Sequence, residues 1–299
     1  MKYLYYPGCS LKGTNRHYEE SVLAVFKALD VDLEELADWN CCGATAYMAV
    51  DEMKAFALAA RNLALAEQQG NSTAATLMAP CSGCYLVLSK TQHYLQEYSE
   101  VSHTIDHALK AARLSYSRQV QIRHPLDLLV NELGLQAIAS KVQRPLQGLK
   151  VACYYGCQIV RPYAAFDDQV NPTSMDHLMK SLGADTVDWP LKTRCCGGSL
   201  MGTVPDVGLP LSYILLKEAQ KRGADVVATV CPLCQFNLEC YQDKMSEQFK
   251  EHLELPVVYF TQLMGVALGI PERQLGLQRL FIPLEPVLAK REGGRHVRV

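Results

Sequence analysis

The sequence lacks any long apolar run. No stretch of its 299 residues approaches the ~20 apolar residues that a membrane-spanning helix needs. The opening residues, MKYLYYPGCS, contain no apolar core of the signal-peptide type. We therefore expect a cytoplasmic chain without direct membrane insertion.

An excess of charge of either sign is also lacking. The chain has 29 Lys and Arg against 31 Asp and Glu, a net charge of −2, so electrostatics gives no argument for nucleic-acid binding. No Gly-x-Gly-x-x-Gly motif is present, which removes the usual flavin or dinucleotide fingerprint. Asp and Glu form no paired arrangement that would indicate hydrolytic acid–base catalysis.

Cysteine, in contrast, is abundant and ordered. Ten of the twelve cysteines fall into two copies of one pattern, a lone Cys, an adjacent Cys-Cys-Gly and a Cys-x-x-Cys. The copies are Cys9, Cys41, Cys42, Cys81 and Cys84, then Cys157, Cys195, Cys196, Cys231 and Cys234. In a reducing cytosol such cysteines are metal ligands or redox groups more often than structural disulfides.

The segments around the cysteines repeat with a period of about 150 residues. In each half a strand runs into the lone Cys, helices follow, and a second strand runs into a Cys-x-x-Cys that opens a helix. We expect one long helix over 45–69 and a mostly helical connector over 103–142. Alternating strands and helices predict an α/β fold of two pseudo-symmetric repeats, with short parallel strands flanked by helices and the Cys ligands at strand C-termini.

The domain boundary is expected in the linker that follows the connector. Residues 1–147 would form the first cysteine-rich repeat with its helical connector. Residues 148–299 would form the second repeat, ending in a basic C-terminal tail over 291–299.

Five cysteines per copy exceed what the common sites use. Structural zinc and a cubane iron–sulfur cluster each take four ligands, and a thioredoxin-like pair takes two. Adjacent thiolates reach one metal group only from an irregular turn, which Gly43 and Gly197-Gly198 allow. Soft thiolates favour iron–sulfur chemistry or zinc, and no histidine falls within the motifs.

The pattern Cys9…Cys41-Cys42-Gly43…Cys81-x-x-Cys84, repeated from Cys157 to Cys234, resembles the duplicated CCG (cysteine-rich) domain that marks the B subunit of heterodisulfide reductase and its relatives. The resemblance covers nearly the whole chain. It implies two [4Fe-4S] clusters of the noncubane type, each held by five thiolates. Carried over by position, the ten cysteines of the two copies would be the iron ligands.

One ligand position offers a choice. Both Cys153 and Cys157 precede the second Cys-Cys pair. Aligning Tyr5-Tyr6-Pro7-Gly8-Cys9 with Tyr154-Tyr155-Gly156-Cys157 selects Cys157, and Cys153 remains its alternative. Cys240 has no counterpart in the first copy and is expected to pack in a helix.

The resemblance implies the catalytic B subunit of a CoB–CoM heterodisulfide reductase-like complex, an oxidoreductase that reduces a disulfide to two thiols. Electrons would come from a ferredoxin-like C subunit, which would receive them through a flavin-containing A subunit from a hydrogenase or other electron-input subunit. Two alternatives stay open. One is a sulfur-oxidising complex that acts on sulfane sulfur in the reverse direction, and the other is a non-catalytic electron-transfer subunit of another oxidoreductase.

Outside the clusters, the sequence offers three candidate catalytic residues. Lys12 and Arg161 follow the lone cysteines closely and could hold a substrate carboxylate or phosphate, although solvated loop charges are commoner. His17 could donate a proton, although a position on a helix surface is commoner.

Overall fold

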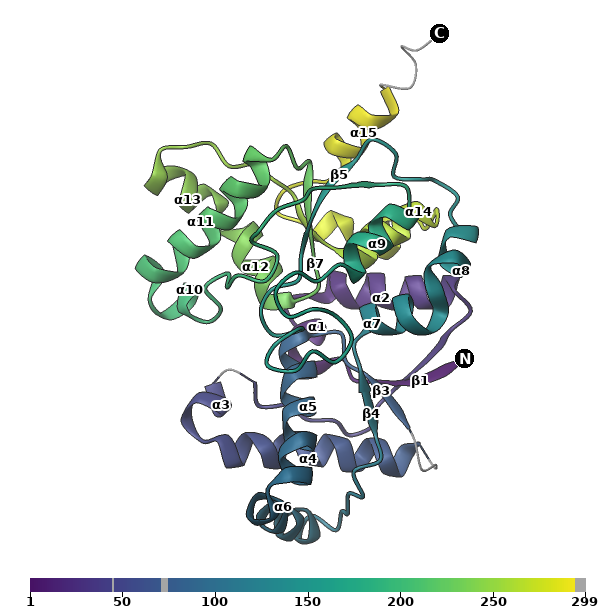
Figure 1. The fold of residues 1–299 in the computed structure, drawn as a ribbon, viewed down its shortest axis with the longest axis vertical. Helices are drawn as coiled ribbons and strands as arrows, with labels where there is room; N and C mark the ends of the chain where they lie inside the picture. Colours follow the sequence, from purple (N-terminus) through teal and green to yellow (C-terminus); the bar gives the residue numbers. More distant parts are fainter. Residues whose placement is uncertain (45, 71–74, 294–299) are drawn as a thin grey trace. The chain divides into compact units, whose positions relative to one another are not determined.

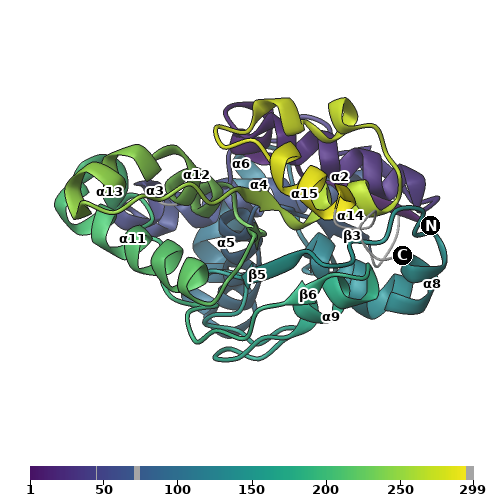
Figure 2. The same cartoon turned by 90° about the horizontal axis from the view of Figure 1, so that it is seen from above.

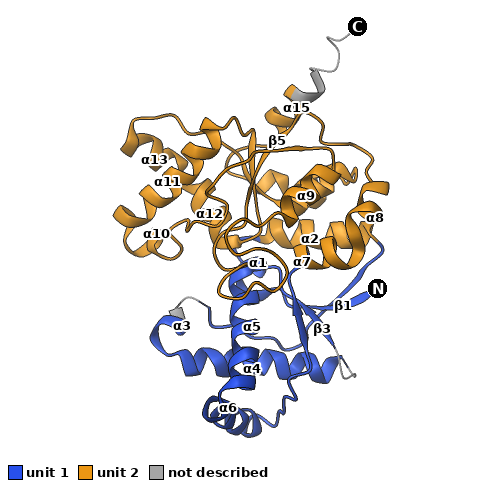
Figure 3. Ribbon diagram, in the orientation of Figure 1, with its two compact units in different colours: residues 1–15, 30–125 blue, residues 16–29, 126–299 orange. Residues whose placement is uncertain are grey.

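The computed structural model describes residues 1–44, 46–70 and 75–293. It divides into two compact units, shown in Figure 3. Unit 1 comprises Met1–Asn15 and Asp30–Pro125, and unit 2 comprises Arg16–Leu29 and Leu126–Val299. The expected basic tail lies largely in residues 294–299, outside the described residues.

Unit 1 is built on a four-stranded parallel sheet in the order β2-β1-β3-β4. Its strands are β1 (Lys2–Tyr5), β2 (Asp32–Glu35), β3 (Thr76–Met78) and β4 (Gln121–Arg123). Its helices are α1 (Gly8–Lys12), α3 (Ala46–Val50), α4 (Glu52–Gln69), α5 (Ser82–Glu97) and α6 (Ser99–Ala111). Helices α4, α5 and α6 pack on one another (Figure 1).

Unit 2 repeats this arrangement with a parallel sheet in the order β6-β5-β7-β8. Its strands are β5 (Lys150–Tyr154), β6 (Asp185–Thr186), β7 (Val226–Thr229) and β8 (Val257–Tyr259). The first of its helices in the chain is α2 (Arg16–Ala28). The short helix α7 (Pro125–Asp127) starts at the last residue of unit 1 and continues into unit 2. The helices continue with η1 (Leu128–Gly134), α8 (Leu135–Ser140), α9 (Ser174–Ser181), α10 (Leu200–Thr203), α11 (Pro205–Lys221), α12 (Pro232–Cys240), α13 (Gln242–Phe249), α14 (Phe260–Ala267), η2 (Glu272–Leu275), η3 (Leu277–Arg279) and α15 (Glu285–Gly293).

Side chains of β5 alternate between the two faces of the second sheet. Ala152 and Tyr154 belong to the core that this sheet shares with α11, α12 and α13. The views in Figures 1 and 2 place α2, α9 and α14 on the other side. The α/β prediction, two repeats with parallel strands flanked by helices, is confirmed.

Helix α2 belongs to unit 2 although unit 1 segments flank it in the chain. The Tyr18 ring stacks on that of Tyr259, with centroids 3.9 Å apart and planes 5° from parallel. The hydroxyls of Ser21 and Thr261 are 2.7 Å apart. His17 lies on the same helix and is only 5% exposed, so the expectation of a surface position is wrong. The α2 face that buries it packs against residues far away in the sequence.

The single helix expected over 45–69 is wrong in one respect. Asp51 interrupts it with an extended backbone, φ −152° and ψ 94°, and separates α3 from α4. The Asp51 carboxylate accepts a hydrogen bond from the Lys54 N–H at 3.1 Å. This N-cap supplies an acceptor to the first turn of α4 and so fixes where the long helix begins. Thr45 lies outside the described residues.

Three strands escape the sequence patterns. β2 and β6 lie in segments expected to be connections, and β4 lies inside the connector expected to be mostly helical. All three are short edge strands held by parallel pairing to a neighbouring strand. Within the described ranges, none of the helices combines the length and the apolar character needed to cross a bilayer.

Candidate functional site

The ten patterned cysteines gather in two groups, one in each unit. The first thiol set is Cys9, Cys41, Cys42, Cys81 and Cys84, and the second thiol set is Cys157, Cys195, Cys196, Cys231 and Cys234. In each sheet the first strand, β1 or β5, is central. The chain goes from it to the edge strand on one side, β2 or β6, and then to the strand on its other side, β3 or β7. The carboxyl ends on either side of the central strand are where parallel sheets place ligand sites.

Each set takes its members from the same three places. The lone Cys follows the central strand: Cys9 lies in the first turn of α1 after β1. The Cys-x-x-Cys follows the next strand, with Cys81 as N-cap of α5 and Cys231 as N-cap of α12. The Cys-Cys pair lies in the irregular segment after β2 or β6. The predicted positions beyond the strand ends therefore correspond to the structure.

The first thiol set has a buried inner pair and an exposed outer pair. The sulfur atoms of Cys42 and Cys84 are 3.3 Å apart and both residues are buried. Those of Cys41 and Cys9 are 3.9 Å apart and both residues are exposed. One edge of the set is thus open to solvent while the other is anchored in the core.

The second thiol set has the same design. The buried pair is Cys196 and Cys234, with sulfur atoms 3.4 Å apart. The outer pair is Cys157 and Cys195, whose thiols are hydrogen-bonded to each other, and Cys195 is exposed. The two sets are therefore equivalent in layout.

Glycine before each lone cysteine makes room for the inner pair. Gly8 and Gly156 have φ values of +68° and +70°. A Cβ atom on Gly8 would lie 3.0 Å from the Cys84 sulfur, and one on Gly156 would lie 3.1 Å from the Cys234 sulfur. Both the backbone conformation and the close approach disfavour a side chain at these positions.

Glycine after each Cys-Cys pair turns the backbone back to the core. Gly43 has φ +81° and Gly197 has φ +93°. A Cβ atom on Gly197 would lie 3.0 Å from the Gly208 Cα atom. The irregular turn predicted from these glycines is present, and it lets adjacent cysteines contribute to one set.

Neighbouring thiols and backbone N–H groups set the protonation of these cysteines. Hydrogen bonds from Cys42 and Cys9 lower the pKa of Cys41, helped by the Gly43 N–H. A hydrogen bond from Cys234 lowers the pKa of Cys196, helped by the Gly198 N–H. Backbone donors aimed at sulfur favour the thiolate, which is the form that binds metals.

A tyrosine three residues before each lone cysteine lies near enough to its set to feel the charge of the thiols, and neither tyrosine was predicted as a site residue from the sequence. The Tyr6 hydroxyl donates to the Asn40 carbonyl oxygen at 2.7 Å, and the Tyr154 hydroxyl donates to that of Arg194 at 2.6 Å. Burial, followed by the nearby thiols, raises the pKa of both phenols. Each tyrosine thus ties the strand end to the residue before a Cys-Cys pair. Aligning the two copies without a gap would have revealed the shared offset.

Cys153 does not join the second thiol set. It is fully buried on β5 beside Tyr154, so its side chain points to the opposite face of the sheet. Burial, followed by the charge of Asp176, raises the pKa of its thiol. In the ungapped alignment Cys153 occupies the place of Tyr5. Cys240 ends α12 and is partly exposed, in accord with the expected helical position.

Asn237 contacts the second thiol set from α12 and was not singled out from the sequence. Its amide nitrogen lies 2.9 Å from the Gly198 carbonyl oxygen and 3.6 Å from the Cys196 sulfur. Asn237 is 1% exposed. The corresponding position in the first copy is Val87, which has no donor. The signal in the sequence was a polar residue on an otherwise apolar helix face.

The three candidate catalytic residues are placed differently. Arg161 lies beside the second thiol set, where it donates to the Thr193 carbonyl oxygen and its charge contributes to lowering the pKa of Cys195 after the hydrogen bond from Cys157. Lys12 forms an exposed ion pair with Glu35 at 2.7 Å. His17 is buried on α2, away from the position expected for it.

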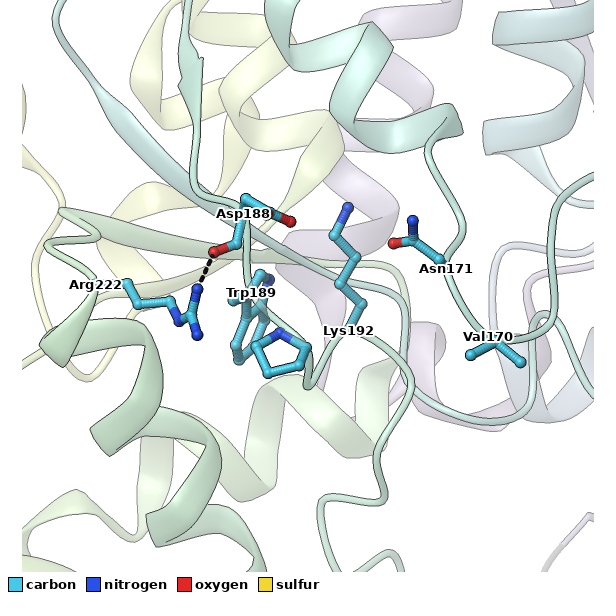
Figure 4. Close-up of a pocket in the computed structure, with 7 residues that line it drawn as sticks. Val170, Asn171, Asp188, Trp189, Lys192 and Arg222 are labelled. Carbon is cyan, nitrogen blue, oxygen red and sulfur yellow. Dashed lines mark hydrogen bonds between the residues drawn. The ribbon is translucent and has the colours of Figure 1, made fainter.

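A pocket of ≈ 360 Å³ lies in unit 2 along the segment that leads to Cys195 (Figure 4). Trp189, Lys192 and Arg222 line it. Lys192 pairs with Asp176 at 2.9 Å, and Arg222 donates to the Asp188 carbonyl oxygen at 2.7 Å. The Lys192 carbonyl oxygen accepts the N–H groups of the two residues before Cys157, at 2.9 and 3.0 Å. The pocket wall therefore helps to hold the second thiol set in place.

The donor chemistry of both sets suits a thiolate-bound metal group. Each set offers five thiols, backbone N–H groups directed at sulfur, and glycines that keep side chains out of the space beside it. Soft thiolates are the donors of iron–sulfur and zinc sites. Among the residues described, no group of three or more His, Cys, Asp or Glu is arranged around a single metal ion.

Known proteins share this sequence over nearly its whole length. The chain is 33% identical to the 8-methylmenaquinol:fumarate reductase membrane anchor subunit of Wolinella succinogenes, over 94% of this chain and 97% of that protein. It is 28% identical to the B subunit of the ferredoxin:CoB-CoM heterodisulfide reductase of Methanosarcina mazei, over 95% and 94%. It is also 28% identical to a protein of Archaeoglobus profundus that is named as similar to the B subunit of heterodisulfide reductase, over 93% and 94%.

A solved structure has the same fold. The crystal structure of a hypothetical protein from Helicobacter pylori matches with a TM-score of 0.77 and 15% identity, over 94% of this chain and 52% of that chain. The CCG family model, described as a cysteine-rich domain, matches residues 3–89 and 151–239. These two ranges contain the two thiol sets. The chain therefore belongs to the CCG cysteine-rich domain family, carries that domain twice, and is a relative of the B subunit of heterodisulfide reductase.

Proposed function

We propose that this chain is the B subunit of a heterodisulfide reductase-type complex and reduces a disulfide to two thiols. The observation that carries the proposal is the presence of two complete five-thiol sets of equivalent layout, one in each sheet. The relatives named after the B subunit of heterodisulfide reductase, similar over nearly the full chain, support the same activity.

Each thiol set would hold one [4Fe-4S] cluster, with all five of its cysteines as ligands and the fifth thiolate favouring a noncubane form. Such a group, when bound, supplies electrons one at a time. The chain's own contribution is to hold ten thiols in place and to favour the thiolate form at some of them, Cys41 and Cys196 among them. Backbone N–H groups at the Cys-Cys turns favour the thiolates, and Tyr6 and Tyr154 fix the segments that carry them.

Reduction of a disulfide consumes two electrons and two protons and releases two thiols. Two one-electron groups in one chain match this requirement. The outer pairs are the edges at which a sulfur substrate can approach, because Cys9, Cys41 and Cys195 are exposed and Cys157 is partly exposed. The charge of Arg161 beside the second set suits a substrate that carries a carboxylate or phosphate.

The electrons would come from a ferredoxin-like C subunit, supplied in turn by a flavin-containing A subunit and a hydrogenase or other input subunit. The name of the Methanosarcina mazei relative includes ferredoxin, which supports an iron–sulfur donor. We place the complex in the cytoplasm, because ten thiols must remain reduced.

Metal and sulfide analysis of the anaerobically purified chain tests the proposal. We expect about eight iron and eight sulfide per chain. Cys42→Ser and Cys196→Ser should each lower both values by about half, because each removes an inner ligand of one set. Zinc with little iron would contradict the proposal, as would full iron content in both variants.

A disulfide reductase should also bind its thiol product at the cluster. Adding thiols to the oxidised chain should produce a new paramagnetic signal that broadens when iron-57 is incorporated. The signal should disappear in one of the two Cys→Ser variants. Its absence with every thiol tested would remove the case for chemistry at sulfur.

One comparison favours a second function. The relative at 33% identity is named as the membrane anchor subunit of a quinol:fumarate reductase. A chain of that type would pass electrons within a respiratory oxidoreductase without binding a disulfide. Normal iron content, no response to thiols and copurification with a fumarate reductase flavoprotein would identify this role instead.

A further inference from the structure

A buried carboxyl group lies on the helix that carries two ligands of the second thiol set. Glu239 is on α12, whose first residues include Cys234, and is only 3% exposed. Glu239 lies five positions after Cys234, about 7.5 Å along the helix axis. Helical side chains lean toward the N-terminus, and the Glu239 carboxyl meets the side chain of Gln235, one turn earlier on α12 and next in the chain to Cys234.

Neutral groups hold this carboxyl. Gln235 donates its amide N–H to Oε2 at 2.5 Å, and the backbone N–H groups of Phe281 and Ile282 donate to Oε1 at 3.0 and 3.3 Å. The same Gln235 amide contacts the Val257 carbonyl oxygen at 3.1 Å. Burial raises the pKa of Glu239 to about 7, and the three donors limit the rise.

His17 lies on the other side of Gln235. Burial lowers the pKa of its imidazole to about 4, while Gln235 and then Glu20 oppose this and Arg279 adds to it. At neutral pH the imidazole is uncharged, so it offers Glu239 no compensating positive charge. The remaining charged groups on this side, Glu20 and Arg279, pair with each other at 2.9 Å.

Solvent reaches the segment that covers Glu239. A pocket of ≈ 390 Å³ is lined by Phe281 and Ile282, whose N–H groups bind the carboxylate. Asp243, His252 and Glu254 also line it, and His252 and Glu254 are 3.2 Å apart. Next to Glu239 in the chain lies Cys240, which Lys244 faces. Titratable groups and the segment that binds Glu239 thus line the same solvent-accessible pocket.

We propose that Glu239 is the proton-holding group of the second thiol set. It takes up a proton from water when an electron enters the redox group held by that set, and it releases the proton when the electron leaves. The electron comes from the iron–sulfur donor of the complex, and the proton balances its charge. This inference rests on the proposed function, because it requires a redox group at that set.

Electrostatics explains the coupling. An added negative charge about 10 Å away, in a medium of effective dielectric about 20, moves the protonation curve of a carboxyl up by about one pH unit. A group that is half-protonated near neutral pH then takes up about half a proton for each electron. The first copy has Tyr85 and Ser89 at the positions of Gln235 and Glu239, so the coupling belongs to the second set alone.

The test measures the reduction potential of the second redox group as a function of pH. The full chain carrying Cys42→Ser isolates that group, because the first set has lost an inner ligand. We expect the potential to fall as pH rises through neutrality, with a slope that reaches about half a proton per electron, because a pKa shift of about one unit changes the bound proton by that amount. Adding Glu239→Gln should make the slope flat. Glu247→Gln, on an exposed carboxyl of the next helix, should leave the slope unchanged.

Infrared difference spectra of the wild-type chain give a second readout that does not depend on any variant folding. Reduction should produce the carbonyl band of a newly protonated carboxylic acid, which shifts in carbon-labelled glutamate protein. No such band, or a pH slope that survives Glu239→Gln, overturns the inference while the proposed function stands. A chain without a redox group in either set contradicts both.

Discussion

Single side chains make the two thiol sets unequal although their cysteines match. Asn237 reaches the Cys196 sulfur, whereas Val87 occupies that position in the first copy. A hydrogen bond to sulfur stabilises the negative charge that arrives on reduction. The second redox group should therefore have the higher reduction potential of the two.

Asn237→Val tests this difference. We expect the potential of the second group to fall by about 40 mV, the equivalent of a hydrogen bond worth about 1 kcal/mol. Ser212→Ala removes a 2.8 Å bond to the Cys196 carbonyl oxygen without touching sulfur, and it should leave the potential near its starting value. The potentials are measured by redox titration followed by electron paramagnetic resonance. Equal shifts of the reduction potential in the two variants would mean that the substitutions disturbed only the fold.

Two buried groups in unit 2 give opposite pH dependence of stability. The pKa of Glu239 is about 7 when folded against an ordinary 4.5, so unfolding releases its proton. Raising pH from 4.5 to 7 therefore lowers the free energy of unfolding. The pKa of His17 is about 4 when folded against an ordinary 6.5, so unfolding takes up a proton. Raising pH from 4 to 6.5 therefore raises the free energy of unfolding. Each effect amounts to about 3 kcal/mol over its window.

Urea unfolding between pH 4.5 and 7 separates the two contributions. Glu239→Gln should leave a stability that rises with pH more steeply than in the wild type. His17→Asn should leave one that falls more steeply. Three superimposable profiles would show that neither group is buried as described.

The sequence could predict the residues whose pattern is repeated. The ten cysteines and the glycines beside them follow a motif that recurs at similar offsets, because adjacent thiols need those turns. His17, Gln235 and Glu239 could not be predicted as neighbours. Their proximity depends on α2 packing against segments more than 200 residues away, which no local pattern encodes.

At the scale of elements, strand ends and helix starts position the thiols. Predicted elements whose apolar residues are buried, such as β1, β3, β5 and β7, are present. The strands that were missed have little apolar signal. β2 reads Asp-Leu-Glu-Glu and is partly exposed, and β6 has two residues. Backbone pairing to a buried neighbour holds them, and pairing leaves no mark on hydrophobic periodicity.

The turn from β5 into Cys157 gives a prediction at this scale. Gly156→Ala places a Cβ atom 3.1 Å from the Cys234 sulfur at φ +70°. Gly223→Ala meets the same backbone strain at φ +75°, with no atom within 4 Å of its Cβ. Both should cost about 1 kcal/mol of stability. Only Gly156→Ala should also reduce the iron content, by up to half, and equal iron content in the two variants would contradict the role of this glycine.

On the scale of the whole molecule, the two compact units do not coincide with the two sequence halves. Residues 1–15 and 30–125 form one unit, while α2 between them belongs to the other. The buried face of α2, with Val22, Val25 and Phe26, packs within unit 2. The division at 1–147 and 148–299 stays a prediction, and the packing of α2 within unit 2 leads us to propose that the two parts do not fold independently.

Splitting the chain at that repeat boundary tests this consequence. Residues 1–147 alone should aggregate, because α2 keeps its apolar face without α14, and residues 148–299 should do the same without α2. Coexpression of the two fragments should restore a soluble, iron-containing complex. Tyr18→Ala, which removes the stack on Tyr259, should weaken that recovery. Stable, folded fragments in isolation would refute the shared packing.

The placement of α2 also sets an order of events during synthesis. The helix is complete at Ala28, but its partner α14 ends at Ala267. At about 5–20 residues per second, the ribosome needs about 10–50 s to supply that partner. Throughout this interval an apolar helix stands exposed, and once Cys84 has been made the nascent unit beside it carries all five thiols of the first set. Cells that make this protein must keep the unfinished chain both chaperoned and reduced before either metal group can be installed.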